Sequence, residues 1–455
     1  MLPSSVIQNE YHEATKHSLI SVQLDPNYVD ASTQPTAFKT YPHFFRRFPL
    51  NADHPIHTFL ALTSAITYQK QYRDGVHALR VQPSAGALYP TELYVQIRGV
   101  EGLLDGLYHI EPQHERLTLL YELIDDGLEG YLADQRLIQG FIFLVTCVYF
   151  RSSWKYKNRS LRYCFLDSGH QVGAIEAAAY VSHFPYQLQF DFDQLALNDD
   201  LGFDTQEFAT AMVVVGEPKQ TTRPKAVRRL RSPLPQVPGT DYFEPNRFIE
   251  SAYQETFEGV GSREWGVGGA DASLFYQSAF PFTSDQWREA ILQRRSARRF
   301  YPNPISHEAF LTLCEAFQQP IPSDLAEDLE IYAVVHRVAG LEPGLYQYPF
   351  HDHSLCLKPG EFHSQTGYLC IHQAIARDCA VVFFITSACR NYRVALQQAG
   401  IVGHRIYLAA TALNIGCSGI GAYYDDETQA FLGSDRPVLY AIAIGQTTAP
   451  KLVSA

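Results

Sequence analysis

The stretch GLYHIEPQHERL, at residues 106–117, returns in altered form 238 residues later as GLYQYPFHDHSL, at residues 344–355. Each version begins with Gly-Leu-Tyr, places polar residues in its middle and has apolar residues on either side. This pattern is typical of two strands joined by a tight turn. One strand-turn-strand pattern that occurs twice indicates that the chain contains two copies of the same structural unit.

Three other pairs of segments repeat in the same order. They are FLALTSAI (59–66) with FLTLCEAF (310–317), RYCFLDSGHQVGAIEAAA (162–179) with RVALQQAGIVGHRIYLAA (393–410), and AMVVVGE (211–217) with YAIAIGQ (440–446). The first two pairs have the small and apolar residues of buried helices, and the last pair has the apolar run of a buried strand. We therefore predict an α+β fold in which two tandem-duplicated copies are fused in one chain.

The repeats divide the chain into four parts. We expect an N-terminal arm (1–40), a first copy (41–216), a linker (217–283) and a second copy (284–455). The linker assignment rests on residues 217–239, where proline and basic residues are frequent. Such a composition is typical of connecting segments rather than of packed helices or strands.

The composition excludes several classes of protein. Of the 455 residues, 46 % are apolar, and the net charge is −12. This acidic balance argues against nucleic-acid binding. No apolar run of about 18 residues is present and the first residues lack a signal pattern, so we expect a cytoplasmic protein with no membrane partner. The eight cysteines form no C-x-x-C pair and the HDH motif at 351–353 is typical of a solvated turn, so we expect no metal site.

The two copies differ where a ligand could bind. The first copy contains PSAGALYP at 83–90, and the second has PSDLAEDLEIY at 322–332 in the corresponding place. Small residues allow a flat molecule to approach the backbone closely. We therefore predict a close-approach surface at Pro83, Ser84, Ala85 and Gly86, in the first copy alone.

The second copy has two features that the first copy lacks. In RRSARRF (294–300), we expect a helix to end before the alternating Arg294, Ser296 and Arg298, which can form a clamp for a phosphate or carboxylate. A solvated basic helix end is the alternative interpretation. We expect a loop at IGCSGIGAYYDDE (415–427), where the glycines can let backbone N–H groups face a ligand. The spacing of these glycines does not match the dinucleotide-binding fingerprint.

The first copy is longer than the second by nine residues before its long helix. The additional segment contains RSSWKYKNRS, at 151–160. Lys155 and Tyr156 in this segment can act as an acid or base if a ligand site excludes water from them. A surface loop is the alternative interpretation.

Together, PSAGALYPTELYV, WKYKNRSLRYCFLDSGH, RRSARRF and SGIGAYYDD resemble the nitroreductase superfamily, and most closely its SagB-type (ThcOx-like) flavin dehydrogenases. The resemblance covers about 41–216 and 284–455. It implies an α+β fold that usually forms intertwined homodimers with FMN at the subunit interface. Here the two copies would form that pair within one chain, as a pseudo-dimer with one FMN site. The chain itself would then be a monomer or a homodimer.

The same resemblance implies the residues that contact FMN. They are Arg294, Ser296 and Arg298 at the phosphate and ribityl end, Gly419, Ile420 and Gly421 near the isoalloxazine ring, Pro83, Ser84, Ala85 and Gly86 from the other copy, and Gln373 facing the flavin. Lys155 and Tyr156 would be the catalytic pair that helps to remove a proton.

The implied activity is hydride transfer through FMN in a ping-pong cycle. SagB-type, azoline-like dehydrogenation of a small molecule or a modified peptide is one alternative. Reduction of nitro compounds or quinones with NAD(P)H as the donor is another. A flavin-binding scaffold protein without catalysis is the third.

Overall fold

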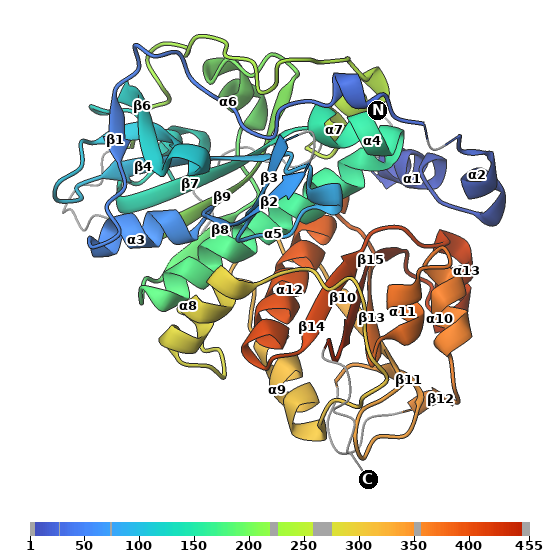
Figure 1. The fold of residues 1–455 in the computed structure, drawn as a ribbon. Helices are drawn as coiled ribbons and strands as arrows, with labels where there is room; N and C mark the ends of the chain where they lie inside the picture. Colours follow the sequence, from blue (N-terminus) through green and yellow to red (C-terminus); the bar gives the residue numbers. More distant parts are fainter. Residues whose placement is uncertain are drawn as a thin grey trace. The chain divides into compact units, whose positions relative to one another are not determined.

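Two antiparallel sheets organise the chain, one in each of two units (Figure 1). This computed structural model describes residues 5–26, 28–72, 75–218, 226–257, 275–349 and 356–447. The first unit consists of Met1–Tyr11, Val29–Ala279 and Pro320–Ala326, and the second consists of His12–Tyr28, Phe280–Gln319 and Glu327–Ala455. The HDH motif at 351–353 lies outside the described residues.

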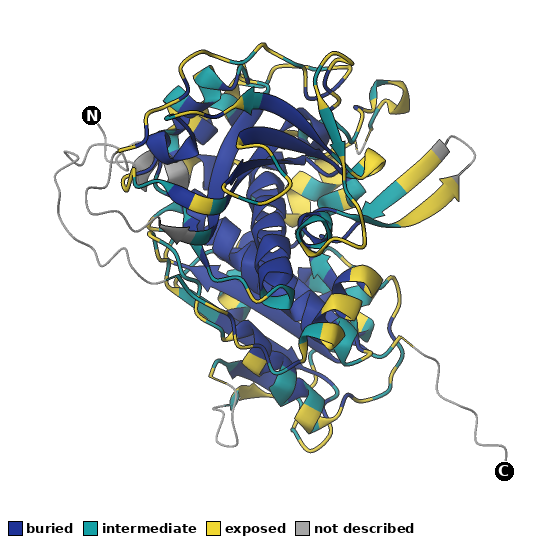
Figure 2. Ribbon diagram, turned by 90° about the vertical axis from the view of Figure 1, so that its left-hand side faces the viewer, coloured by how far each residue is buried: buried dark blue, intermediate teal, exposed yellow. Residues whose placement is uncertain are grey.

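The sheet of the first unit has the strand order β1-β6-β5-β4-β7-β9-β8. Its strands are β1 (Arg47–Pro49), β4 (Thr91–Arg98), β5 (Gly106–Glu111), β6 (Arg116–Glu122), β7 (Ile138–Val148), β8 (Tyr186–Gln189) and β9 (Glu207–Pro218). Every residue of β4 is buried. Helix α5 (Ser160–Val181) contacts this strand, and Lys39 donates to the Glu92 carboxylate and the Tyr94 hydroxyl. A separate hairpin of β2 (Ile66–Tyr72) and β3 (Gly75–Arg80) extends into solvent, as its exposed strands in Figure 2 show.

The long helix of the first unit packs against the middle of this sheet. The described α-helices before residue 280 are α1 (Ser5–Ala14), α2 (Leu19–Leu24), α3 (Pro55–Leu62), α4 (Phe150–Tyr156), α5 (Ser160–Val181), α6 (Gln194–Asp200) and α7 (Arg247–Glu255). Helix α5 contacts β4, β7 and β9, and its small residues Gly173, Ala174 and Ala177 allow this close approach. Helix α7, within the predicted linker, packs on β9, where the rings of Tyr253 and Phe208 stack with centroids 4.0 Å apart.

The sheet of the second unit has the strand order β12-β11-β10-β13-β15-β14. Its strands are β10 (Leu329–Val335), β11 (Gly344–Gln347), β12 (Cys356–Pro359), β13 (Val381–Ser387), β14 (Gly416–Ile420) and β15 (Val438–Gly445). Its helices are α8 (Ser284–Gln293), α9 (His307–Phe317), α10 (His363–Leu369), α11 (Ala374–Asp378), α12 (Tyr392–Ala412) and α13 (Asp425–Leu432).

Alternate residues of β13 show how the second core is built. Phe383 stacks with Phe310 of α9, on the face covered by α9 and α12. Phe384, one residue further, belongs to the core on the opposite face, with Ile375 of α11 and Phe431 of α13 against it. Both faces of the strand are therefore apolar, which explains the continuous apolar sequence VVFFIT.

The two strand orders correspond one for one. β6, β5, β4, β7, β9 and β8 of the first sheet match β12, β11, β10, β13, β15 and β14 of the second. The four repeated sequence pairs fall on α3 and α9, on α5 and α12, on the β5–β6 and β11–β12 hairpins, and on β9 and β15. The predicted α+β class in two sheet-containing halves is confirmed. The duplication as an evolutionary event and the predicted domain limits stay predictions.

Two local expectations differ from the structure. The additional segment at 151–160 is mostly helical and includes α4, and the glycine-rich segment forms the edge strand β14 instead of a loop. None of the described helices is both long and apolar enough to cross a membrane. Within the described ranges, no group of three or more His, Cys, Asp or Glu side chains could hold a metal ion.

Candidate cofactor site

The turn before β4 has an unusual backbone. Gly86 has a φ of 64°, and the non-glycine residues Ala87 and Tyr89 have φ values of 54° and 47°. Side chains other than glycine rarely adopt this left-handed conformation, and residues held in it need support from their surroundings. Ser84, Ala85 and Ala87 are partly exposed and Gly86 is exposed, whereas Pro83 is buried.

A carboxylate from α5 supports this turn from below. Ser84 Oγ donates to Asp167 Oδ2 at 2.6 Å, and the Ala85 N–H donates to Asp167 Oδ1 at 3.2 Å. The Tyr89 N–H in turn donates to Ser84 Oγ at 2.9 Å. Burial raises the pKa of Asp167 to about 7, against the opposing effect of the hydrogen bonds from Ser84 and Ala85.

The predicted catalytic pair lies against the same turn. A Cβ atom added to Gly86 would be 2.6 Å from the Tyr156 hydroxyl oxygen and 3.4 Å from Lys155 Nζ. The space that a side chain would fill at Gly86 is therefore taken by Tyr156. The structure brings together two predicted segments that are about 70 residues apart in the chain.

The two members of this pair have different surroundings. Lys155 is exposed, and its ammonium group lies 5.4 Å from the centroid of the Tyr156 ring. Tyr156 is partly buried. Burial, and then the neighbouring Tyr163 and Asp167, raise the pKa of the Tyr156 phenol above its ordinary value. Tyr156 therefore keeps its proton at neutral pH and is a hydrogen-bond donor.

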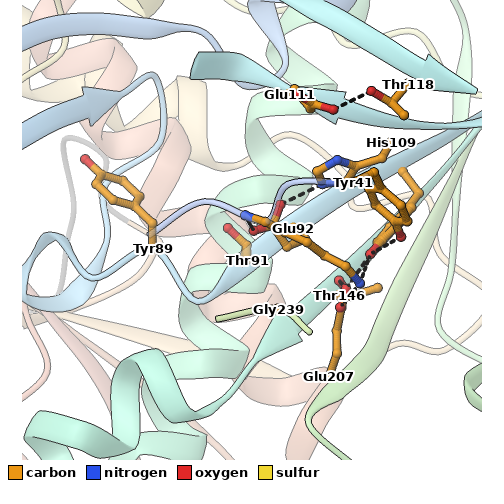
Figure 3. Close-up of polar contacts among 12 residues, drawn as sticks. Tyr41, Tyr89, Thr91, Glu92, His109, Glu111, Thr118, Thr146, Glu207 and Gly239 are labelled. Carbon is orange, nitrogen blue, oxygen red and sulfur yellow. Dashed lines mark hydrogen bonds and ion pairs between the residues drawn. The ribbon is translucent and has the colours of Figure 1, made fainter. Parts of the chain in front are cut away.

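A buried ionic cluster connects the turn to α4. Glu92, the second residue of β4, contacts His109 Nε2 at 2.8 Å (Figure 3). Its carboxylate also lies 2.6 Å from Arg151 Nη2. Arg151 Nη1 also donates to the backbone oxygen of Tyr89 at 3.1 Å. Burial disfavours the charge on Glu92, but Arg151 and His109 outweigh burial and lower the pKa of this carboxyl. Arg151 thus holds the turn and α4 together, four residues before Lys155.

A second ion pair is buried beside this cluster. Lys39 Nζ lies 2.8 Å from Glu207 Oε2, and the hydroxyls of Tyr94 and Thr146 donate to Glu207 Oε1 at 2.9 and 2.5 Å (Figure 3). Burial opposes the charge on Lys39, but Glu207 outweighs this effect and raises the Lys39 pKa. Our sequence analysis did not identify either cluster; the only signal was a glutamate at the start of each of two apolar strands.

In the second unit, Tyr407 of α12 connects the two predicted cofactor segments. Its hydroxyl oxygen is 3.0 Å from Ser296 Oγ and accepts the Gly419 N–H at 2.6 Å. The buried guanidinium of Arg294 lies 5.4 Å from the centroid of the same ring. The Ala297 N–H donates to the Cys417 oxygen at 2.8 Å, which holds residues 294–298 beside β14. Sequence analysis missed Tyr407, because the residues of α12 are apolar or polar without a distinguishing pattern.

The helix before Arg294 has a well-defined start and end. Thr283 and Gln286 form a capping box at the first turn of α8, with hydrogen bonds of 3.2 and 2.9 Å. The helix ends at Gln293, and Arg294 is its C-cap, as the predicted end of a helix before Arg294 requires. The capping box stabilises the start of α8, and the contact between the Arg294 guanidinium and the Tyr407 ring holds the residue that follows the end of the helix.

The assignment of Gly419 to the cofactor stays a prediction, but its N–H group has a partner within the protein. That N–H group is bound to Tyr407, and a Cβ atom at Gly419 would be 1.9 Å from the Tyr440 hydroxyl oxygen. Glycine is needed here for packing within the protein. Ile420 is buried in the core, and Gly421 follows directly after β14.

The last two predicted residues lie next to these segments. Arg298 is exposed, and its Nη1 has long contacts of 3.5 and 3.4 Å to the backbone oxygens of Ser296 and Ala297. Gln373 is the N-cap of α11, and its Nε2 donates to the Ala422 oxygen at 3.2 Å. Arg298 is thus near Ser296, and Gln373 is near the end of β14.

The second-copy counterpart of the turn has a different environment. The Leu188 N–H donates to the Pro322 oxygen at 2.8 Å, and the Asp324 carboxylate accepts the N–H groups of Phe190 and Asp191 at 2.8 and 2.9 Å. Residues 322–324 therefore cover the edge strand β8 of the first unit. This pairing accounts for Asp324, at the position where the first copy has the small residue Ala85.

Residues 291–446 match the nitroreductase family. This part of the chain is therefore similar to the nitroreductase family. A Methanocaldococcus jannaschii protein named as a nitroreductase is 25 % identical over 177 residues, which are 35 % of this chain and 89 % of that protein. The crystal structure of an Anabaena variabilis protein described as a nitroreductase covers 97 % of this chain and 99 % of its own, with 25 % identity and a TM-score of 0.77. The predicted nitroreductase-like fold is therefore confirmed.

Arg294, Ser296, Gly419 and Tyr407 all lie in the segment that matches the nitroreductase family, and the turn at 83–90 belongs to the first unit. The structure describes each unit by itself. The predicted sharing of one flavin between the two copies stays a prediction.

Proposed function

We propose that the protein is an FMN-dependent oxidoreductase with one flavin site per chain. The observation that carries this proposal is the meeting of Arg294, Ser296 and β14 at Tyr407, within the segment that matches the nitroreductase family.

The chemistry of the residues fits an FMN phosphate and ribityl chain. Arginine guanidinium groups and a serine hydroxyl are the donors that phosphate recognition uses most effectively. Arg298 is the exposed guanidinium of the set, and Arg294 and Ser296 are held in place by Tyr407. We assign the phosphate contact to Arg298 and the ribityl contact to Ser296.

Bound FMN would supply hydride acceptance and donation, which amino-acid side chains cannot perform. We assign proton transfer at the substrate to Lys155 and Tyr156. Tyr156 keeps its proton at neutral pH and can donate a hydrogen bond to a substrate, and the exposed Lys155 can exchange a proton with water. Two substrates would act in turn at this site, in a ping-pong cycle.

The position of α4 favours SagB-type dehydrogenation over nitro or quinone reduction. Helix α4 places Tyr156 against Gly86 of the predicted flavin-binding turn, and Arg151 at its start holds the same turn. A proton-transfer pair beside the flavin is useful for removing hydrogen from a small molecule or a modified peptide. Nitro and quinone reduction also take up protons, but these can come from water, whereas removal of a proton from a substrate needs a positioned base.

The test begins with the absorption spectrum of the purified protein, in which we expect a flavin band. Arg298→Gln removes the exposed guanidinium and should weaken FMN binding about tenfold or more, as expected for a charge-assisted contact. Arg299→Gln is the matched control, because Arg299 is also exposed but lies over the Tyr301 ring at 4.9 Å. A colourless protein that binds no added FMN would exclude the proposal.

A further inference from the structure

The carboxyl group of Asp167 is buried beneath the turn at 83–90 and bound by it on both oxygens. Ser84 Oγ lies 2.6 Å from Oδ2, and the Ala85 N–H lies 3.2 Å from Oδ1. Ser84 Oγ also accepts the Tyr89 N–H at 2.9 Å. Because Ser84 is partly exposed and Asp167 is only 4 % exposed, the serine hydroxyl lies between a buried acid and the accessible side of the turn.

The proton on Asp167 determines where the hydroxyl hydrogen of Ser84 points. An ionised carboxylate can only accept hydrogen bonds, so Ser84 must donate to it. A neutral carboxyl donates from Oδ2, and Ser84 Oγ then accepts two hydrogen bonds, one from Asp167 and one from the Tyr89 N–H. The hydroxyl hydrogen of Ser84 is then released from Asp167 and can be donated elsewhere.

We propose that Asp167 is a positioning residue that makes the Ser84 hydroxyl a hydrogen-bond donor toward bound flavin when it takes up a proton. When Asp167 releases the proton to water, Ser84 donates to the carboxylate again. One proton moves between water and Oδ2, one hydroxyl rotates, and no electron is transferred. This inference rests on the proposed FMN site, to which Ser84 is assigned.

The titratable groups that face Asp167 keep their protons near neutral pH. From α4, Tyr156 faces it, and burial raises the Tyr156 pKa above its ordinary value. From β7, Cys147 faces it, and burial raises that thiol's pKa well above its ordinary value. On α5 itself, the ring of Tyr163 packs against the Tyr156 ring with centroids 4.6 Å apart. Tyr156 and Cys147 therefore stay protonated through the neutral range.

Three cationic groups also contact the turn. The exposed Lys155 ammonium approaches Gly86, Arg151 Nη1 donates to the Tyr89 oxygen at 3.1 Å, and the Arg80 guanidinium lies 4.9 Å from the centroid of the Tyr89 ring. The raised pKa of Asp167, about 7, places the change of its proton near neutral pH. Both orientations of the Ser84 hydroxyl are therefore accessible near neutral pH, because the hydrogen bond to Asp167 allows either and the carboxyl changes its proton in this range.

Two variants hold the hydroxyl in opposite states. In Asp167→Asn, the amide nitrogen donates permanently to Ser84 Oγ and the amide oxygen still accepts the Ala85 N–H, as in the protonated acid. In Ser84→Ala, no hydroxyl is available to the flavin. Glu176→Gln is the matched control, because Glu176 is a buried carboxyl on the same helix that is bound to Tyr186 and Ser278 instead of to the turn.

The experiment measures the dissociation constant of FMN by flavin fluorescence from about pH 5 to about pH 9 and divides each value by that of Glu176→Gln at the same pH. This division removes the titration of the FMN phosphate, whose pKa is about 6. Near-ultraviolet circular dichroism checks that each variant is folded.

We expect Asp167→Asn to keep the low-pH affinity of the wild type at every pH and Ser84→Ala to keep the high-pH affinity. The wild type should change between these two levels near pH 7, by about threefold to tenfold, the contribution of one neutral hydrogen bond. A wild-type pH profile in Asp167→Asn or in Ser84→Ala would overturn the inference. If Asp167→Asn does not fold, the Ser84→Ala profile still decides.

Infrared spectroscopy of the flavin-free protein gives a second readout. The carbonyl band of a protonated aspartic acid should be lost near pH 7 in the wild type and be absent from Asp167→Asn. Loss of that band near pH 4 would overturn the inference independently of FMN. A wild type that binds no FMN at any pH would overturn the proposed function, whereas a wild type that binds FMN with the Glu176→Gln profile would overturn the inference alone.

Discussion

Gly86 illustrates how a single residue determines the geometry of the proposed site. Its φ of 64° favours glycine, and the direction of a side chain is occupied by the Tyr156 hydroxyl. Gly102 has a similar φ of 82°, but a Cβ atom there would meet nothing within 4 Å. Alanine substitutions at the two glycines therefore share the cost of the left-handed backbone conformation, and only the substitution at Gly86 adds a clash.

We predict that Gly86→Ala and Gly102→Ala each lower the free energy of unfolding by about 1–2 kcal/mol, the cost of a left-handed alanine. Gly86→Ala should also displace Tyr156 and reduce turnover by roughly tenfold to a hundredfold, because a shift of this size disturbs a reacting geometry. Urea unfolding and steady-state kinetics check both effects. Equal turnover in the two variants would show that Tyr156 does not depend on Gly86.

Asp167 predicts a pH dependence of stability. Its folded-state pKa of about 7 is above the ordinary value of 3.8, so the folded state binds this proton more tightly than the unfolded state. The contribution of Asp167 to stability therefore falls as pH rises from about 4 to about 7 and is constant above that range.

Asp167→Asn removes this dependence, because an amide does not ionise. Relative to the wild type, the variant should gain up to about 4 kcal/mol of unfolding free energy between low pH and pH 8, since each pH unit is worth about 1.4 kcal/mol. Urea unfolding at about pH 4 and about pH 8 measures the gain. The same difference between variant and wild type at both pH values would contradict the assignment of the raised pKa to Asp167.

At the scale of secondary-structure elements, Tyr407 connects α12 to β14 and to the segment after α8. Its hydroxyl is the shared partner of Ser296 Oγ and the Gly419 N–H. Tyr423, in the same unit, is also buried, and its hydroxyl donates to the Val438 oxygen at 2.8 Å. Tyr423 therefore provides a matched buried hydroxyl that is bound to the backbone of β15.

We predict that Tyr407→Phe and Tyr423→Phe each cost about 1–3 kcal/mol of stability, because each leaves a buried polar group without the partner named above. Tyr407→Phe alone should weaken FMN binding, about tenfold, because Ser296 and β14 lose their common contact. Isothermal titration calorimetry with FMN and thermal unfolding measure the two quantities. An FMN affinity that Tyr407→Phe leaves unchanged would remove Tyr407 from the site.

At the scale of the whole molecule, the two units share one strand order but carry different chemistry. The turn at 83–90 is open and partly exposed in the first copy, whereas its counterpart at 322–324 is paired with the edge strand β8. The second copy has the Arg-Arg-Ser segment, and the corresponding part of the first copy, YPHFFRRF, lacks it. Two complete sets of cofactor residues are therefore not encoded.

We predict one FMN per chain. Flavin released by denaturing the saturated protein should amount to one equivalent of the polypeptide, as measured by absorbance of the supernatant. Two equivalents would mean that the second copy binds flavin with residues other than those proposed.

Much of the fold could be predicted from the sequence, because strands, helix ends and repeats leave local patterns. The end of α8 before Arg294 and the burial of α5 against the sheet follow from neighbouring residues and small-residue composition. The glycine-rich segment was predicted as a loop, because glycine suits both a loop and a strand against which Tyr440 packs. The choice between the two depended on β15, which lies beside β14 only in the folded chain.

The sequence by itself therefore determined the α+β class, the two similar halves and the segments assigned to the cofactor. Only the tertiary structure decided which side chains hold those segments: Asp167 beneath Ser84, Tyr156 against Gly86, Arg151 between Glu92 and Tyr89, and Tyr407 between Ser296 and Gly419. The reason is physical. Local patterns reflect backbone conformation and burial, whereas a hydrogen bond between residues tens to more than a hundred positions apart depends on how the elements pack.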